Sequence, residues 1–150
     1  MTKADKAKEL FLNGYNCSQA VFGAFCEDLG IEFSLGVKLA SGFGGGFSRR
    51  REVCGAVSGA VMVLSLVYGY TEAQAREEKI RLYEKVRHAL SDFEEETGSI
   101  ICRELLGLKE KSSNPVPEER TDKYYAKRPC AELVYIAARI LEEKMAEADK

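Results

Sequence analysis

The chain has 150 residues, a formal net charge of -2 and a sequence pI of about 5.6. This length predicts one domain spanning residues 1–150, large enough to bury a hydrophobic core without disulfides or metals. The slightly acidic balance argues against a nucleic-acid partner. The charged opening Met1–Leu10 lacks the apolar stretch of a signal peptide, so we expect a cytoplasmic protein.

The hydrophobic pattern predicts an all-α chain of about six to seven helices, because no segment alternates with the period of a strand. N-cap residues and helix-stop glycines set the boundaries. Between the last two helices we expect Lys109–Arg128 to be a long loop. The predicted helices are Thr2–Asn13, Cys17–Leu29 capped by Asn16, a short one from a Ser34 cap to Ala40, Val53–Tyr68, one opened by a capping box at Thr71–Gln74 and running to about Glu96, Ile100–Leu106 capped by Ser99, and Cys130 to about Ala148 after Pro129.

The segment Val53–Tyr68 is apolar or small at nearly every position, so we expect it to be the central and most buried helix of a helical bundle. It is shorter than the roughly 20 residues that a membrane span needs, which argues against membrane insertion. Gly55 and Gly59 fall on one face, and Ala56 and Ala60 widen that face. This strip of small residues predicts close approach by a neighbouring helix.

Four of the five cysteines stand at the starts of predicted helices, namely Cys17, Cys54, Cys102 and Cys130. In a reducing cytoplasm, cysteines more often serve redox chemistry or metal binding than structural disulfides, and an odd count argues against complete pairing. Free N–H groups at a helix start favour an anion, so a thiol there tends to have a lowered pKa. Because core-type residues follow each of the four, we expect their thiols to face inward and converge on one pocket.

A glycine cluster at residues 42–46, followed by Arg49, Arg50 and Arg51, comes before Cys54. The arginines raise the local positive potential and favour the thiolate form, so we predict that Cys54 is the most reactive thiol. The glycines are best explained as a tight turn between helices. Anion or nucleotide binding is the alternative, although the cluster lacks the Lys-Ser/Thr of a P-loop and follows no predicted strand.

Simple packing or solvent exposure explains several other residues. Cys26 lies mid-helix in line with core residues, and we expect it to pack as a small hydrophobic residue. His88, the only histidine, lies in a charged helix and is expected at the surface. Three interpretations fit the stretch Lys123–Arg128: a docking patch, a lid over the cysteine pocket, or an ordinary solvated loop.

The motifs around the cysteines carry a resemblance to a known family. They are Asn16-Cys17-Ser18-Gln19-Ala20, then Cys54-Gly55-Ala56-x-x-Gly59, then the single cysteines Cys102 and Cys130. Over most of the chain they resemble a family of redox-active proteins named for its C…CGAxxG…C…C pattern. The resemblance implies a small helical bacterial or archaeal protein with a redox role, without naming its reaction. A similar arrangement occurs in the iron–sulfur portion of split-Soret cytochromes, but this chain has no CxxCH haem-attachment motif.

Three functions are compatible with this sequence. The first is thiol–disulfide or electron-transfer chemistry at the four cysteines, with an unidentified redox partner. In the second, the same cysteines hold a metal, so the cofactor is none, an iron–sulfur cluster or another thiolate-bound metal. In the third, the protein is a non-catalytic scaffold in which the cysteines only pack. The sequence leaves open whether the protein is an enzyme and whether it forms a homodimer.

Overall fold

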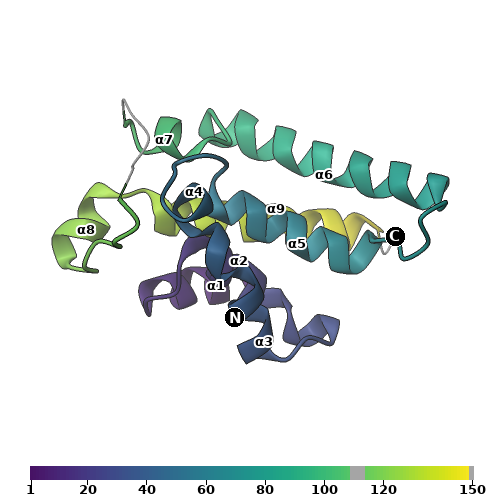
Figure 1. The fold of residues 1–150 in the computed structure, drawn as a ribbon, viewed down its shortest axis with the longest axis horizontal. Helices are drawn as coiled ribbons and strands as arrows, with labels where there is room; N and C mark the ends of the chain where they lie inside the picture. Colours follow the sequence, from purple (N-terminus) through teal and green to yellow (C-terminus); the bar gives the residue numbers. More distant parts are fainter. Residues whose placement is uncertain (109–113, 149–150) are drawn as a thin grey trace.

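The computed structural model describes residues 1–108 and 114–148. Within these ranges the regular structure is helical, and extended pairing is limited to one isolated antiparallel bridge between Val53 and Ile101. The predicted all-α fold is therefore confirmed (Figure 1). In chain order the elements are α1 (Lys3–Leu12), α2 (Cys17–Phe25), the 3-10 turn η1 (Glu27–Leu29), α3 (Phe33–Ala40), the 3-10 turn η2 (Ser41–Phe43), α4 (Gly44–Phe47), α5 (Gly55–Tyr68), α6 (Arg76–Thr97), α7 (Cys102–Leu105), α8 (Asp122–Lys127) and α9 (Cys130–Ala148).

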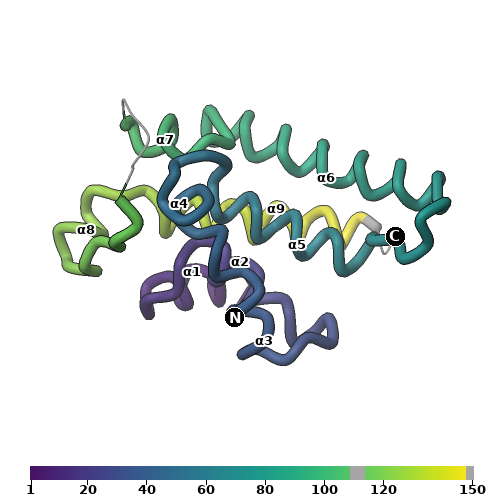
Figure 2. The backbone as a smooth tube through the Cα atoms, in the orientation of Figure 1, coloured from purple at the N-terminus to yellow at the C-terminus, as the bar shows by residue number. Residues whose placement is uncertain are grey.

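The longer helices form the body of the molecule. Helices α5, α6 and α9 contact one another, α1 packs on α9, and α2 packs on α1, α3, α5 and α9. The short helices α4, α7 and α8 gather at one end of the molecule, where α5 and α9 begin (Figure 2). Several helix starts are thereby brought to the same end of the fold.

The first two helices begin with capping boxes, in which side chains satisfy free backbone groups. The Thr2 hydroxyl accepts a hydrogen bond from the Asp5 N–H at 3.0 Å. The Asn16 side chain accepts one from the Gln19 N–H at 3.0 Å, and the Gln19 side chain accepts one from the Asn16 N–H at 3.1 Å. The predicted cap at Asn16 is confirmed, and it sets Cys17 as the first residue of α2.

The predicted helix Cys17–Leu29 is divided in the structure. Helix α2 ends first, and η1 then leads to Gly30, whose φ of 88° is the left-handed conformation of a helix-stop glycine. The predicted cap at Ser34 is wrong, because α3 starts one residue earlier and Glu32 is its N-cap residue. The Ser34 hydroxyl donates to the Glu32 carboxylate instead of accepting a hydrogen bond from a backbone N–H.

The capping box predicted at Thr71–Gln74 is not formed, and α6 begins later, at Arg76. The preceding residues form a turn in which the Ala75 N–H donates to the Glu72 carbonyl at 3.1 Å. Two glutamates in the first turn of α6 place negative charge at the positive end of its dipole. The charge of the first turn therefore takes the place of a side-chain cap.

Helix α7 is shorter than the predicted Ile100–Leu106, because the chain before it pairs with the segment that precedes α5. The Cys54 N–H donates to the Ile100 carbonyl at 2.8 Å, and the Cys102 N–H donates to the Glu52 carbonyl at 2.6 Å. These two bonds tie the start of α7 to the start of α5. They hold Cys54 and Cys102 in neighbouring segments.

The predicted loop Lys109–Arg128 contains helix α8, so that prediction is wrong for residues 122–127, while residues 109–113 lie outside the described part of the chain. The Thr121 hydroxyl caps α8 by accepting a hydrogen bond from the Tyr124 N–H at 3.2 Å. The polar composition of this stretch hid a helix that begins with an ordinary threonine cap.

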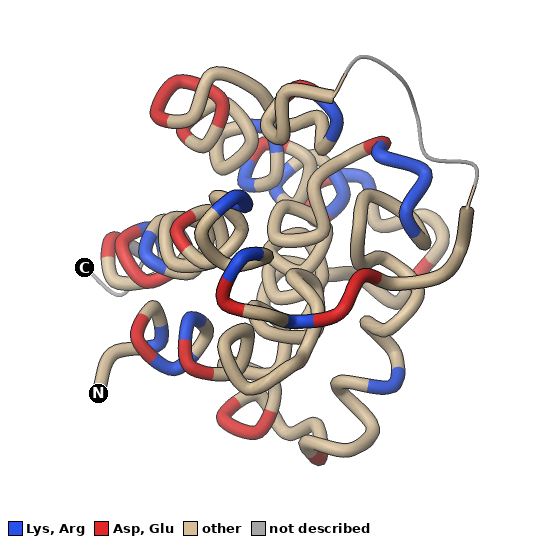
Figure 3. The backbone as a smooth tube through the Cα atoms, turned by 90° about the vertical axis from the view of Figure 1, so that its left-hand side faces the viewer, with Lys and Arg blue, Asp and Glu red and all other residues tan. Residues whose placement is uncertain are grey.

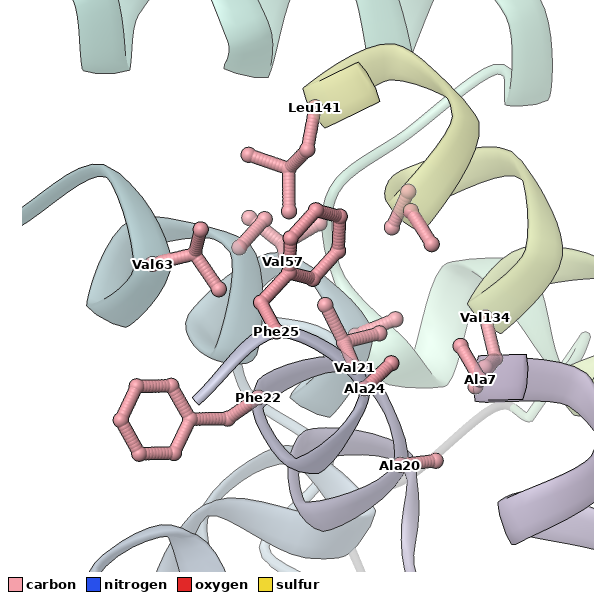
Figure 4. Packing of buried hydrophobic residues seen from close by; sticks show 14 of the residues in the cluster. Ala7, Ala20, Val21, Phe22, Ala24, Phe25, Val57, Val63, Val134 and Leu141 are labelled. Carbon is pink, nitrogen blue, oxygen red and sulfur yellow. The ribbon is translucent and has the colours of Figure 1, made fainter. Parts of the chain in front are cut away.

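The core forms where α2 packs against its neighbours. Figure 4 shows Val21 of α2, Val57 of α5 and Leu141 of α9 directed into the same buried cluster. A Cβ atom at Gly59 would lie 2.8 Å from the Ser18 carbonyl oxygen and 3.1 Å from the Val21 Cβ. Only glycine allows the two backbones this distance, so the predicted close helix contact at the small-residue strip is confirmed.

Helix α2, rather than Val53–Tyr68, is the most completely buried helix, which corrects our expectation. Every residue of α2 except Gln19 is buried, whereas Leu66 and Val67 of α5 are 41% and 37% exposed. Helix α5 has 14 residues and α2 has 9, so the C-terminal turns of α5 extend beyond the helix that covers its first turns.

No helix in the described ranges combines the length and apolarity needed to cross a membrane. On the side of the molecule seen in Figure 3, basic and acidic segments are interspersed along the chain.

Candidate functional site

Four cysteines meet where α5 and α9 begin. Cys17, Cys102 and Cys130 are the first residues of α2, α7 and α9, and Cys54 is the N-cap residue of α5. All four are buried, and all four line one cavity of about 60 Å³, which we call the cysteine cavity. Their predicted convergence is confirmed. The cavity is also lined by Phe11, Asn16, Gly45, Arg51, Gly55, Leu105, Leu106, Arg120, Tyr124 and Leu133.

Two glycines allow the cysteine-bearing segments to approach one another. A Cβ atom at Gly55 would lie 3.1 Å from the Cys17 Cβ and 3.1 Å from the Phe43 carbonyl oxygen. A Cβ atom at Gly46, whose φ is 69°, would lie 2.8 Å from the Cys102 Cβ. The glycine cluster thus turns the chain, as predicted, and its lack of side chains also lets its backbone pack closely against the cysteine-bearing segments.

The thiols of Cys17 and Cys130 interact within the cavity, and each shifts the pKa of the other. This interaction and burial raise the pKa of Cys17 well above its ordinary value. The same interaction lowers the pKa of Cys130; the positive charges of Arg128, Arg51 and Arg120 lower it further, against the opposing effect of burial. Of the two thiols, Cys130 therefore loses its proton more readily.

Cys54 has the opposite electrostatic environment. Burial raises its pKa to about 12, although the backbone N–H groups of Val57 and Ala56 act in the lowering direction. The helix-start effect that we predicted is therefore present at Cys54, but desolvation outweighs it. Among the four cavity cysteines, the pKa is lowered at Cys130 and not at Cys54, the thiol that we predicted to be the most reactive.

Only one of the three predicted arginines reaches the cysteine cavity. Arg51 is 8% exposed, and its Nη1 donates to the Cys102 sulfur at 3.7 Å. Burial raises the pKa of Cys102, and the contact with Arg51 opposes that rise. Arg50 points outward, with a side chain that is 70% exposed. Arg49 turns away from the cavity and donates to the Asn114 carbonyl at 3.2 Å.

Residues 120–128 bring two further side chains to the cysteine cavity. Arg120 lines the cavity with its guanidinium 4.3 Å from the centre of the Phe11 ring, and it donates to the Tyr15 carbonyl at 3.0 Å. Tyr124 also lines the cavity, and burial raises the pKa of its hydroxyl to about 12. This position agrees with the lid interpretation of Lys123–Arg128, whereas nothing in the sequence pattern indicated Arg120.

Cys26 and His88 lie where we expected them, in the core and at the surface respectively. Cys26 is fully buried, and its sulfur would lie 2.5 Å from a Cβ atom at Gly36. Its thiol is not part of the cysteine cavity, so it is a packing residue. His88 is exposed on α6, as expected.

Four thiols are a suitable donor set for a soft metal or an iron–sulfur cluster. In the described residues, however, no three His, Cys, Asp or Glu side chains stand in an arrangement that would hold a metal ion.

The comparisons with known proteins agree with the cysteine pattern. A family described as "Putative redox-active protein (C_GCAxxG_C_C)" matches residues 15–144, a range that includes all four cavity cysteines. An uncharacterised protein of Archaeoglobus fulgidus is 32% identical over 116 residues, which cover 70% of this chain and 77% of that protein. No solved structure matches the chain. The chain therefore belongs to the C_GCAxxG_C_C family, in which its own motif reads Cys54-Gly55-Ala56-Val57-Ser58-Gly59.

Proposed function

We propose that this protein carries out thiol–disulfide chemistry, with Cys130 and Cys17 as the reacting pair. The observation that carries the proposal is that both thiols line one buried cavity, where they interact with each other and where Arg51 and Arg120 add positive charge. A lowered thiol pKa raises the thiolate fraction at neutral pH, and the thiolate is the nucleophile in disulfide exchange. The redox description of the family supports the same class of chemistry.

The reaction has two exchange steps. The Cys130 thiolate attacks one sulfur of an oxidant disulfide, a mixed disulfide forms, and the other sulfur leaves as a thiolate. The Cys17 thiol then loses its proton and attacks the Cys130 sulfur, which releases the second oxidant thiolate and leaves a Cys17–Cys130 disulfide. Two electrons pass from the cysteines to the oxidant; the Cys17 proton completes one released thiol, and solvent returns the proton that Cys130 had lost to the other. A dithiol reductant reverses both steps.

Cys54 and Cys102 support this pair as neutral thiols. Burial raises the pKa of both residues, and charge on either one would repel a thiolate on the pair. Their protonated state leaves the cavity with one negative charge, which the neighbouring arginine charge balances. We therefore assign Cys130 the nucleophilic role and Cys17 the resolving role.

The test is to map the disulfide that forms under controlled oxidation. The anaerobically purified protein is equilibrated with ratios of reduced and oxidised dithiothreitol, free thiols are alkylated, and linked peptides are identified by mass spectrometry. We expect a peptide that joins Cys17 to Cys130, which is lost in Cys130→Ser and kept in Cys26→Ser. Absence of any linked pair would favour the packing hypothesis, and stoichiometric metal in the purified protein would favour the metal hypothesis; either result overturns the proposal.

A further inference from the structure

Arg51 is a buried cation whose hydrogen bonds are incomplete. Its side chain faces the cysteine cavity, and among the described residues its Nε is the one buried side-chain nitrogen or oxygen without a hydrogen-bond partner. Its Nη1 donates to the Cys102 sulfur, a weak acceptor, at 3.7 Å. Leaving a buried charged donor unpaired costs free energy, so this guanidinium is suited to bind an anion in the cavity.

The backbone that positions Arg51 is strained. All five residues of the segment 45–49 have φ between 54° and 70°, and Arg51 has a φ of 62°. A left-handed turn is unfavourable for residues other than glycine, and such strain persists only where the surrounding structure enforces it. Here the Arg51 N–H donates to the Gly45 carbonyl at 3.1 Å, and the Glu52 N–H donates to the Gly46 carbonyl at 3.0 Å. The fold thus holds an unfavourable turn that directs Arg51 inward.

A second cavity of about 270 Å³ adjoins the cysteine cavity, and we call it the outer cavity. Exposed residues such as Ser48 and Pro117 form part of its wall. Its acidic group, Glu118, is paired with Arg49 at 3.6 Å and with Arg128 at 2.5 Å, so its charge is compensated. The residues that line both cavities are Asn16, Gly45, Arg51, Arg120 and Tyr124.

We propose that Arg51 binds the anionic group of a small disulfide substrate, one that carries a carboxylate or a sulfonate and reaches the cysteines through the outer cavity. The guanidinium would hold the anionic group while the Cys130 thiolate attacks the substrate sulfur. The anionic group is unchanged, and the bonds made and broken are those of the exchange already described. This inference names the substrate class for the proposed function and so rests on it.

The test uses two alkylating reagents of similar shape and different charge, iodoacetate and iodoacetamide. Both react with the same thiolate, so the ratio of their rates cancels any change in thiol pKa and reports recognition of the negative charge. Alkylation at Cys130 is followed by mass spectrometry. We expect the iodoacetate-to-iodoacetamide ratio to fall about tenfold in Arg51→Gln, the effect of one lost charge-assisted hydrogen bond.

Arg50→Gln is the matched control, because it removes the same charge from a side chain that is 70% exposed. Its ratio should equal that of the unmodified protein. An equal fall in both variants would mean that the effect is general electrostatics, and no fall in Arg51→Gln would mean that Arg51 does not bind the anion; either result overturns the inference. Arg51→Lys retains the charge without the planar fork and should give an intermediate ratio.

A second measurement on the unmodified protein does not depend on variant folding. Sulfate should slow the iodoacetate reaction compared with sodium chloride at the same ionic strength, and no protection would contradict an anion site at Arg51. These outcomes are separate from those of disulfide mapping. Charge selectivity without a Cys17–Cys130 disulfide would support the anion site and contradict the proposed reaction. A Cys17–Cys130 disulfide without charge selectivity would support the reaction and contradict the anion site.

Discussion

The first turns of α9 and α5 each begin with a buried cysteine at the positive end of a helix dipole, and both thiols line the cysteine cavity. At Cys130 the interaction with Cys17 and the charges of the arginines lower the thiol pKa. At Cys54 burial prevails, and the pKa rises to about 12. Two sites with the same local sequence signal thus have thiol pKa values shifted in opposite directions.

The difference between these sites shows which interactions control thiol protonation in this fold. A helix dipole contributes about 0.3–1 kcal/mol at an exposed position, which is too little to offset complete desolvation of a thiolate. The groups that favour the Cys130 thiolate are Cys17, Arg51 and Arg120, distant in sequence, and Arg128, which the end of α8 places beside α9. Tertiary contacts therefore decide at which helix start the thiol pKa is lowered.

The largest expected effect comes from removing one cysteine at a time. Cys130→Ser should abolish the fast-alkylating thiol at neutral pH, whereas Cys54→Ser should leave that reaction in place because Cys54 is protonated. A fall of one unit in pKa raises the thiolate fraction about tenfold, so the two variants are readily distinguished. Thiolate absorbance and iodoacetamide rates as a function of pH make the measurement. Loss of the fast phase in Cys54→Ser would restore our sequence-based choice of nucleophile.

A smaller effect is expected from a substitution that disturbs helix packing without changing the protonation of the cysteines. Gly59→Leu should lower the free energy of unfolding by about 1–3 kcal/mol, because its side chain would press on the α2 backbone at Ser18. The cost should be the same with reduced and oxidised cysteines, since Gly59 does not line the cysteine cavity. Urea denaturation measures it. Gly42→Leu is the matched control, because Gly42 is exposed and a Cβ atom there meets nothing within 4 Å; equal loss in both variants would contradict the close helix contact.

Much of the fold was predictable because its signals are local. Asn16 caps α2, Gly30 and Gly98 end helices with positive φ, and Pro129 precedes α9. The errors arose where distant segments compete for backbone groups. The first residues of the predicted helix Ile100–Leu106 pair with the segment before α5 and are therefore not helical. No local sequence pattern indicates such pairing.

The sequence predicted which cysteines form the site, but it did not predict which charged side chains surround them. Helix starts indicated where the four thiols lie, and the convergence of those starts followed from their inward faces. Adjacent arginines in the sequence were not equivalent in space: the left-handed turn directs Arg51 inward and leaves Arg50 outside. Arg120 reaches the cavity from a stretch with no helix or motif signal, so only the folded chain reveals it.

The smallest effect tests the difference between Cys54 and Cys130 through the pH dependence of stability. The pKa of Cys54 is about 12 when folded and about 8.5 for an ordinary thiol, so its stabilising contribution is complete below about pH 8.5 and is lost as the pH rises toward 12. Between pH 8.5 and 9.5 this group should cost the folded protein about 1 kcal/mol, a loss that Cys54→Ser should remove. Urea denaturation at several pH values measures the change.

The sign is opposite for Cys130, and this sets the control. Its pKa is lowered in the folded state, so its contribution is present above the unfolded value of about 8.5 and falls as the pH drops through the folded value. Cys130→Ser should therefore flatten the rise in stability on approaching pH 8.5 from below, whereas Cys54→Ser should act only above that pH. If both variants shift the profile in the same direction, the two thiols share one environment, and the assignment of separate roles to the starts of α9 and α5 is wrong.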